Sequence, residues 1–207
     1  MDKNVPKYTN TATFAMGCFW GPDALFGAKP GVVRTRVGYA GGKKTSPTYR
    51  DLGDHTETIQ IDYDPKEIGY EELLKIFLYN HDPTYPKSTQ YRSMIFYHDK
   101  EQEKLAKDMK ESNSDIITII QPFKDFYPAE DYHQKYRLSM NKPLYMAFRD
   151  IYPDINDFVD STAVTRANGY VSGHGHIETA EELRSLGLNS TGRKKLYDIW
   201  KKISGAE

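Results

Sequence analysis

The spacing of apolar side chains changes along the chain, and this change limits the possible folds more than any other feature. In residues 1–140, segments whose apolar residues recur at every second position alternate with segments whose apolar residues recur every three or four positions. Ala12, Phe14 and Met16 show the first spacing, which is typical of a strand, and residues 70–78 show the second, which is typical of a helix. We therefore expect an α+β domain in which helices cover a sheet.

The end of the chain differs because its periodic segments all have helical spacing. Residues 155–168 predict one helix that begins at an Asp154 cap, and a capping-box pattern at Thr179 begins another. We expect residues 1–140 to form the α+β domain and residues 141–207 to form a helical C-terminal extension packed on it.

Composition excludes several classes of function. The net charge is −1 and the pI is about 6.6, so no electrostatic footprint for nucleic acid is expected. The longest apolar runs, IFLY and IITII, are far shorter than the roughly 20 residues of a membrane-spanning helix. The opening MDKNVPKYTN lacks the apolar run of a secretory signal, and a single cysteine favours a reducing compartment. We expect a cytoplasmic protein that contacts neither nucleic acid nor membrane.

The single cysteine, Cys18, lies in the stretch TFAMGCFWGPDALFG, where a predicted strand changes into a predicted helix. A thiol at a helix N-terminus has a pKa below its reference value of about 8.5, and the glycines on both sides leave the sulfur approachable. The local pattern fits a reactive thiol beside an apolar pocket of Phe19 and Trp20, and it also fits a small buried side chain. The six histidines form no cluster with other ligands, so no metal site is expected.

Seven short motifs follow one another between residues 11 and 139. They are GCFWG (17–21), GYAGG (38–42), PTYRDL, DHTE (54–57), NHDPT, TQYRS (89–93) and YPAEDYHQKY (127–136). In this order they resemble the peptide methionine sulfoxide reductases of the A type. The resemblance implies an α+β fold, with a mixed sheet around a ferredoxin-like core flanked by helices. It also implies an oxidoreductase that reduces methionine-S-sulfoxide, free or in peptides and proteins, to methionine.

The resemblance assigns the reaction to four side chains. Cys18 is the nucleophile that attacks the sulfoxide sulfur and becomes a sulfenic acid, and Glu57 is the acid that protonates the oxygen. Tyr49 and Tyr91 donate hydrogen bonds to that oxygen, which is an acceptor without a proton of its own. Because a buried carboxyl beside a thiolate has a raised pKa, we expect Cys18 and Glu57 to share one proton as a coupled pair.

Three further residues are assigned to substrate binding. Phe19 and Trp20 would receive the S-methyl group, whose burial contributes about 0.8 kcal/mol. This contribution is small, so the pocket serves to orient the substrate, and fixing methyl, oxygen and sulfur selects one configuration at sulfur. His55 stands two residues before Glu57, where it either orients the glutamate or caps a turn.

The chain departs from the family pattern in two places. Many members carry further cysteines near the C-terminus that attack the sulfenic acid, and this chain has none. No bound cofactor is expected, and an external thiol, either glutathione with glutaredoxin or thioredoxin, must regenerate Cys18. Pro86 occupies the position of a family aspartate, and Asp82 is the nearest acid. Some members use selenocysteine as the nucleophile.

Two other functions use the same residues. A methionine oxidase would run the reverse chemistry through the same sulfenic acid, with an oxidant in place of a reductant. A non-catalytic module could bind oxidised methionine without turnover, but it would need no nucleophile. The reductase is the leading hypothesis because Cys18, Glu57, Tyr49 and Tyr91 are all present.

Overall fold

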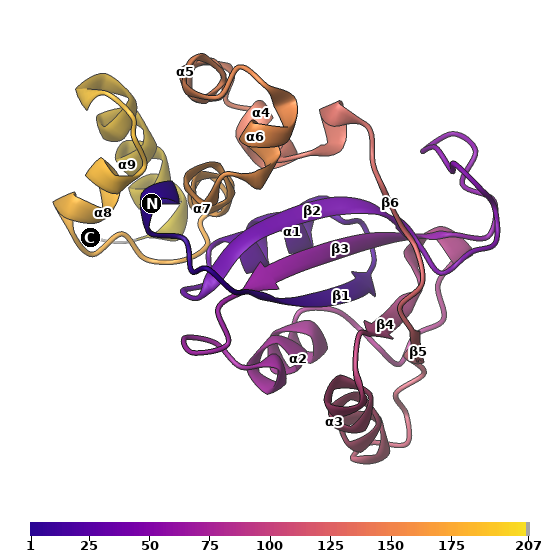
Figure 1. The fold of residues 1–207 in the computed structure, drawn as a ribbon. Coiled ribbons are helices and arrows are strands. Elements are labelled where there is room, and N and C mark those ends of the chain that lie inside the picture. Colours follow the sequence, from indigo (N-terminus) through magenta and orange to yellow (C-terminus); the bar gives the residue numbers. More distant parts are fainter. Residues whose placement is uncertain (206–207) are drawn as a thin grey trace.

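The computed structural model of the chain describes residues 1–205 and contains a curled, mixed sheet (Figure 1). Its six strands are β1 (Asn10–Met16), β2 (Val32–Ala40), β3 (Thr56–Tyr63), β4 (Ser93–Tyr97), β5 (Ile119–Pro122) and β6 (Phe126–Pro128). The strand order is β5-β4-β1-β3-β2-β6. Neighbouring strands are antiparallel except β4 and β5, which are parallel. Strands β1 and β3 therefore pair with each other in the centre, with β4 beside β1 and β2 beside β3.

Helices surround this sheet, which confirms the α+β class. The α-helices are α1 (Trp20–Gly27), α2 (Tyr70–Tyr79), α3 (Lys100–Glu111), α4 (Tyr136–Ser139), α5 (Lys142–Ile151), α6 (Ile155–Asp160), α7 (Thr162–Tyr170), α8 (Ala180–Ser185) and α9 (Ser190–Ser204). Three short 3-10 helices are η1 (Asp2–Asn4), η2 (Thr89–Tyr91) and η3 (Asp131–His133). None of the helices in residues 1–205 is long and apolar enough to cross a membrane.

The main core lies between the sheet and helices α1 and α2. Phe14 of β1 contacts Phe26 of α1 and Phe77 of α2, with ring centroids 5.9 and 5.1 Å apart. Apolar side chains of β3, among them Ile59, belong to the same cluster. Ala15, on the opposite face of β1, is also buried, so both faces of the central strand are covered. The alternation seen in the sequence identifies the strand, and tertiary packing buries its second face as well.

The C-terminal helices lie together beside β2 and α1, away from α2 and α3 (Figure 1). Helix α7 approaches α1 closely because each helix has a glycine at the contact. A Cβ on Gly169 would lie 2.6 Å from the Cβ of Ala28, and a Cβ on Gly27 would lie 2.7 Å from the carbonyl oxygen of Thr165. These helices bury a second apolar cluster of their own. The domain boundary near residue 140 stays a prediction.

Two helices expected from the sequence are interrupted. The single helix predicted over residues 155–168 is divided into α6 and α7, because Ser161 is extended and its Oγ accepts the Val164 N–H that caps α7. The stretch PAEDYHQKYR predicts a helix behind Pro128, but Gln134 is extended and Lys135 has a φ of +50°, so this helix is broken. Contacts distant in sequence override the local preference at both places.

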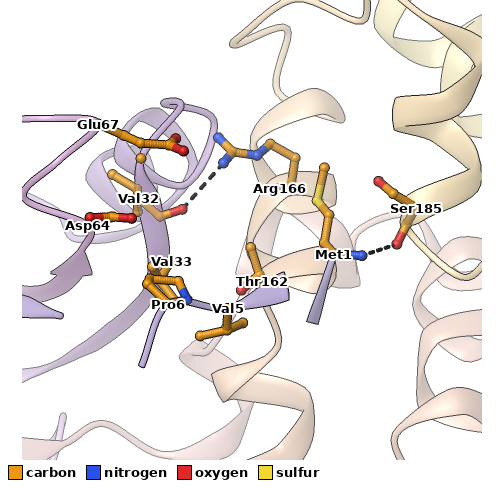
Figure 2. Close-up of a pocket in the computed structure, with 11 residues that line it drawn as sticks. Met1, Val5, Pro6, Val32, Val33, Asp64, Glu67, Thr162, Arg166 and Ser185 are labelled. Carbon is orange, nitrogen blue, oxygen red and sulfur yellow. Dashed lines mark hydrogen bonds between the residues drawn. The ribbon is translucent and has the colours of Figure 1, made fainter. Parts of the chain in front are cut away.

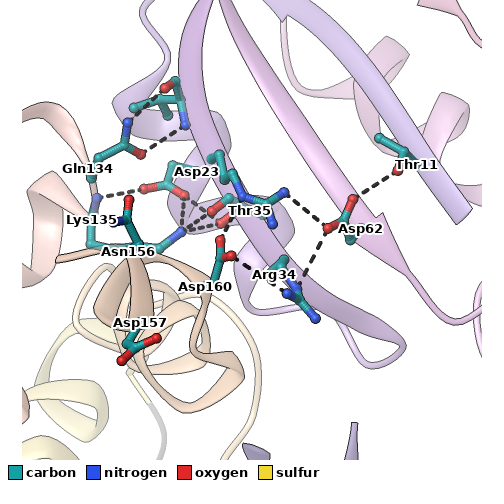
Figure 3. A network of polar contacts seen from close by, with 12 residues as sticks. Thr11, Asp23, Arg34, Thr35, Asp62, Gln134, Lys135, Asn156, Asp157 and Asp160 are labelled. Atoms are coloured by element: carbon teal, nitrogen blue, oxygen red, sulfur yellow. Dashed lines mark hydrogen bonds and ion pairs between the residues drawn. The ribbon is translucent and has the colours of Figure 1, made fainter. Parts of the chain in front are cut away.

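The interruption at residues 134 and 135 places two side chains in the body of the protein. The Gln134 amide pairs with both the N–H (3.1 Å) and the carbonyl (2.8 Å) of Val37. The fully buried Lys135 ammonium contacts the Asp23 carboxylate at 3.0 Å and the Thr35 hydroxyl at 2.6 Å (Figure 3). Residues 134 and 135 are therefore anchored to β2 and to α1.

We predict that Gly169→Ala destabilises the protein, although alanine favours helices. The new Cβ would meet the backbone and Cβ of Ala28 at 2.9 and 2.6 Å, so α7 must move away from α1. We expect a loss of about 1–3 kcal/mol in the free energy of unfolding, measured by denaturant titration.

The matched control is Gly21→Ala, because Gly21 is also helical and a Cβ there would meet nothing within 4 Å. This control should be neutral or slightly stabilised, by up to about 1 kcal/mol. Equal stability of the Gly169 variant and the original chain would show that the two helices are not in tight contact.

Candidate active site

Cys18 lies at the end of β1, immediately before α1. Gly17 has a φ of +98°, which lets the chain turn sharply between the strand and the helix. Phe19 is the N-cap residue of α1, and Trp20 begins the helix. Cys18 is exposed, and the backbone N–H of Trp20 is directed at its sulfur. The strand-to-helix position predicted for the cysteine is therefore confirmed.

Glu57 lies beside Cys18 because β3 is the antiparallel neighbour of β1. Its side chain is 1% exposed. One carboxylate oxygen accepts the Phe19 N–H at 3.0 Å, and the other accepts the Gln90 amide at 2.8 Å. The carboxylate also lies close enough to the Cys18 thiol for each group to shift the pKa of the other. The backbone N–H of Phe19, the residue after Cys18, therefore holds this buried carboxylate beside the Cys18 sulfur.

Burial decides the protonation of this pair. Desolvation raises the pKa of Cys18, and the neighbouring charge of Glu57 adds to this effect. The Trp20 N–H and the positive charge of Arg137 lower that pKa, but they do not offset burial. The lowered thiol pKa expected from the helix N-terminus is therefore wrong. Desolvation also raises the pKa of Glu57, although hydrogen bonds from Phe19, Gln90 and Cys18 oppose the rise.

Two tyrosine hydroxyls stand near this pair. Tyr91, at the end of η2, is close enough to Glu57 and Cys18 for their charges to act on its ring hydroxyl. Desolvation, the charge of Glu57 and a hydrogen bond to Tyr49 raise the pKa of Tyr91 to about 12. This phenol therefore keeps its proton at neutral pH and can serve as a donor.

The aromatic side chains after Cys18 differ in exposure. Phe19 is 1% exposed and packs against Tyr39 and His133. Trp20 is half-buried and stacks on Tyr136, with ring centroids 3.7 Å apart and an interplanar angle of 7°. The two rings therefore form part of a larger aromatic cluster around His133.

His133 was not singled out by the sequence reasoning, although it lies in the YPAEDYHQKY motif. Its ring is buried, and its Nδ1 accepts the Trp20 indole N–H at 3.2 Å. Tyr49 and Tyr132 contact the same ring, with centroid distances of 4.6 and 4.1 Å. Desolvation lowers the pKa of His133, so the ring is neutral and carries its proton on Nε2.

Glu130, from the same motif, holds the loop that carries Tyr49. One carboxylate oxygen accepts the Tyr49 backbone N–H at 3.0 Å, and the other accepts the Tyr39 hydroxyl at 2.7 Å. Desolvation opposes ionisation, but these hydrogen bonds lower the pKa of Glu130. Gln90 and Glu130 both lie within the motifs, but only the geometry of the structure identifies them as residues that position Glu57 and Tyr49.

His55 is buried in the turn between β2 and β3. Its Nδ1 accepts the Gly42 N–H at 3.2 Å, and its Nε2 contacts the Lys44 carbonyl at 2.7 Å. Both ring nitrogens are therefore occupied by the backbone of this turn.

The loop that departs from the family pattern brings no acid to the sulfur. The Asp82 carboxylate accepts the N–H and the hydroxyl of Thr84, at 2.9 and 2.7 Å. Lys87, which follows Pro86, instead lies near the reactive turn, since its Nζ would be 3.8 Å from a Cβ on Gly17. In the part of the chain that the structure describes, no group of three or more histidine, cysteine or acidic side chains could hold a metal ion.

Comparison with known proteins identifies the family. The family model described as "Peptide methionine sulfoxide reductase" matches residues 10–166. A peptide methionine sulfoxide reductase of Drosophila melanogaster is 46% identical over 205 residues, which cover 95% of this chain and 81% of that protein. Peptide methionine sulfoxide reductase A5 of rice is 39% identical, with 94% and 77% covered. The crystal structure of reduced Mxr1 from Saccharomyces cerevisiae is similar with a TM-score of 0.58 and 35% identity, covering 67% of this chain and 88% of that one.

These matches confirm the resemblance first seen in seven short motifs, and with it the assignment to the oxidoreductases. They favour neither the oxidase nor the binding module. The chain belongs to the peptide methionine sulfoxide reductase family, and its activity is the reduction of methionine sulfoxide.

Proposed function

We propose that Cys18 is the nucleophile and Glu57 the acid in the reduction of methionine-S-sulfoxide. The observation that carries this proposal is the position of Glu57, whose 1% exposed carboxyl accepts the Phe19 N–H at 3.0 Å and lies close enough to Cys18 to raise the pKa of its thiol. Burial raises the pKa of both groups, so the pair retains one proton at neutral pH. Transfer of this proton from the Cys18 thiol to Glu57 provides a thiolate and a carboxylic acid together.

The first half of the reaction balances within this site. The Cys18 thiolate gives an electron pair to the sulfoxide sulfur and forms a sulfur–sulfur bond. The oxygen then passes from the substrate sulfur to Cys18, and the sulfur–sulfur bond breaks with its electron pair left on the substrate sulfur. The Glu57 proton goes to the oxygen, which ends on Cys18 as a sulfenic acid. Methionine is released two electrons more reduced, and Cys18 is two electrons more oxidised. Glu57 is recharged from solvent.

We assign the substrate oxygen to Tyr49 and Tyr91. The Tyr91 hydroxyl lies close enough to Tyr49, Glu57 and Cys18 to interact with each of them, and its proton is firmly held. Donors placed where charge develops on oxygen stabilise the transition state more than the ground state. The backbone bond from Tyr49 to Glu130 supports this placement.

We assign the methyl group to Phe19 and Trp20. Phe19 forms the buried wall, and the stack on Tyr136 and the bond to His133 hold the indole of Trp20 rigid. A rigid apolar pocket on one side and hydroxyl donors on the other leave a single orientation for the third substituent. This arrangement supports selection of the S configuration. The contacts of His55 with Gly42 and Lys44 favour its role in shaping the turn over a direct substrate contact.

An external thiol completes the cycle, since the chain has a single cysteine. The thiol attacks the sulfenic acid, water leaves, and a mixed disulfide forms. A second thiol then releases Cys18 and a disulfide. Thioredoxin, or glutathione with glutaredoxin, would supply these thiols. The exposure of Cys18 supports direct access by either one.

We also propose that the four strands β4-β1-β3-β2 are a ferredoxin-like core. Two strand–helix–strand units, β1-α1-β2 and β3-α2-β4, follow each other in the chain. In the antiparallel sheet their strands are interleaved in the order β4-β1-β3-β2. Residues 1–140 would then be the catalytic domain. The cytoplasmic location of the protein stays a separate prediction.

Glu57→Gln should lower kcat for sulfoxide reduction by about 10²- to 10⁴-fold, because the amide cannot give up a proton. The original chain should lose rate in acid, when a second proton binds the pair, and in alkali, when the last one leaves. The variant should show only a small rate that rises with pH as Cys18 ionises.

These profiles are measured between about pH 5 and 9, with Glu71→Gln, an exposed glutamate of α2, as the control. A Glu57 variant that matches the original rate throughout this range would exclude the acid role.

A second prediction concerns the single cysteine. Without reductant, excess methionine-S-sulfoxide should yield one equivalent of methionine and a sulfenic acid on Cys18, detected by trapping and mass spectrometry. Continued turnover should begin only when a thiol reductant is added. Cys18→Ser should release no methionine. Binding without any methionine release would instead support the module, and turnover of the R epimer alone would exclude the proposed stereochemistry.

A further inference from the structure

A cavity of about 280 Å³ lies on another part of the molecule, between the sheet and the C-terminal helices (Figure 2). The residues assigned to the reaction do not line it. The N-terminal segment, the start of β2, the turn after β3 and helix α7 form its walls. Its apolar side includes Val5, Pro6 and Val33, and its polar side includes Asp64, Glu67 and Arg166.

Arg166 of α7 brings a buried charge to this cavity. The side chain is 8% exposed, and one guanidinium nitrogen, Nη2, donates to the Val32 carbonyl at 3.3 Å. The other, Nη1, is buried and has no hydrogen-bond partner within residues 1–205. A guanidinium remains charged in proteins, and a buried charge without a partner is costly. Nη1 is therefore a donor available to an anionic group.

Acidic side chains stand on the other side of the same cavity. Figure 2 shows the Glu67 carboxylate facing the guanidinium of Arg166, and Asp64 lies nearby. Across the described part of the chain no ion pair within 4.0 Å joins Arg166 to either acid. The cavity thus presents the Arg166 guanidinium and two carboxylates that remain apart, while the α-ammonium of Met1, which also lines it, donates to the Ser185 carbonyl.

This arrangement restricts the chemistry of a ligand. Two carboxylates disfavour a multiply charged anion such as phosphate, and Arg166 disfavours a simple cation. A ligand that carries one negative and one positive group satisfies both sides, and the wall of Val5, Pro6 and Val33 suits an apolar remainder. The volume is at the small end of ligand pockets, which run from about 300 Å³ upward.

We propose that this cavity binds a free α-amino acid with an apolar side chain. Its carboxylate accepts from Nη1 of Arg166, its ammonium faces Glu67 and Asp64, and its side chain contacts the apolar wall. The interaction is independent of the reaction at Cys18.

The test uses isothermal titration of the whole chain with L-leucine, which is not a product of the reaction. Saturable binding is expected. L-leucinamide lacks the carboxylate and 4-methylpentanoate lacks the ammonium, so each should bind about 10- to 100-fold more weakly. Inorganic phosphate should not compete. Absence of saturable leucine binding, or equal binding of leucine and either analogue, would overturn the proposal.

Two variants locate the site. Arg166→Met keeps most of the volume and removes the donor, so leucine binding should weaken by about tenfold or more. Glu67→Gln changes an exposed side chain and leaves folding intact, and it should weaken leucine binding without weakening that of 4-methylpentanoate. Glu71→Gln, an exposed acid outside the cavity lining, is the matched control. Sulfoxide reduction should be unchanged in all three. Leucine binding unaffected by both Arg166→Met and Glu67→Gln would place the ligand elsewhere and overturn the proposal.

Discussion

The buried ion pair of Asp23 and Lys135 holds together the segments on which the site depends. Removing two charged side chains from water costs several kcal/mol, and this cost is offset only when every polar atom of the pair has a hydrogen-bond partner. Here the Asp23 carboxylate accepts from Lys135, from the Thr35 hydroxyl and from the Asn168 amide. The Lys135 ammonium also donates to the Thr35 carbonyl and hydroxyl. The first turn of α1, strand β2, the segment after η3 and helix α7 are therefore joined at one fully buried point.

The chemistry of the site follows from competition between two effects on one sulfur. The start of α1 offers the Trp20 N–H to Cys18, which favours the thiolate. Burial and the carboxyl of Glu57 favour the thiol, and they are stronger. The pKa of the isolated thiol is thus not lowered for attack. In the proposed mechanism, reactivity belongs to the pair, because the proton that leaves the Cys18 sulfur is held by Glu57, the acid proposed to protonate the substrate oxygen.

The sequence was informative where local pattern and structure agree. The alternation around Phe14 and the helical spacing of residues 70–78 correspond to β1 and α2. The local pattern of PAEDYHQKYR predicts a helix through residues 134 and 135 and is wrong there, because the conformation of both residues depends on partners about 100 residues away. The direction of the Cys18 pKa shift could not be predicted for the same reason: the helix start is visible in the sequence, whereas the depth of burial beside Glu57 is not.

Helix α7 shows why the C-terminal helices cannot be understood as a simple attachment. The Asn168 amide oxygen accepts the Leu138 N–H at 2.9 Å, while its nitrogen reaches Asp23. Gly169 follows Asn168 in the chain and allows the close approach to α1. Arg166, two residues before Asn168, donates a hydrogen bond to the carbonyl of Val32, the first residue of β2. One turn of this helix thus contacts the helix after Cys18, the segment after His133 and the central sheet. Because α7 packs closely on α1, the position of the turn that carries Cys18 depends on packing that the C-terminal helices supply.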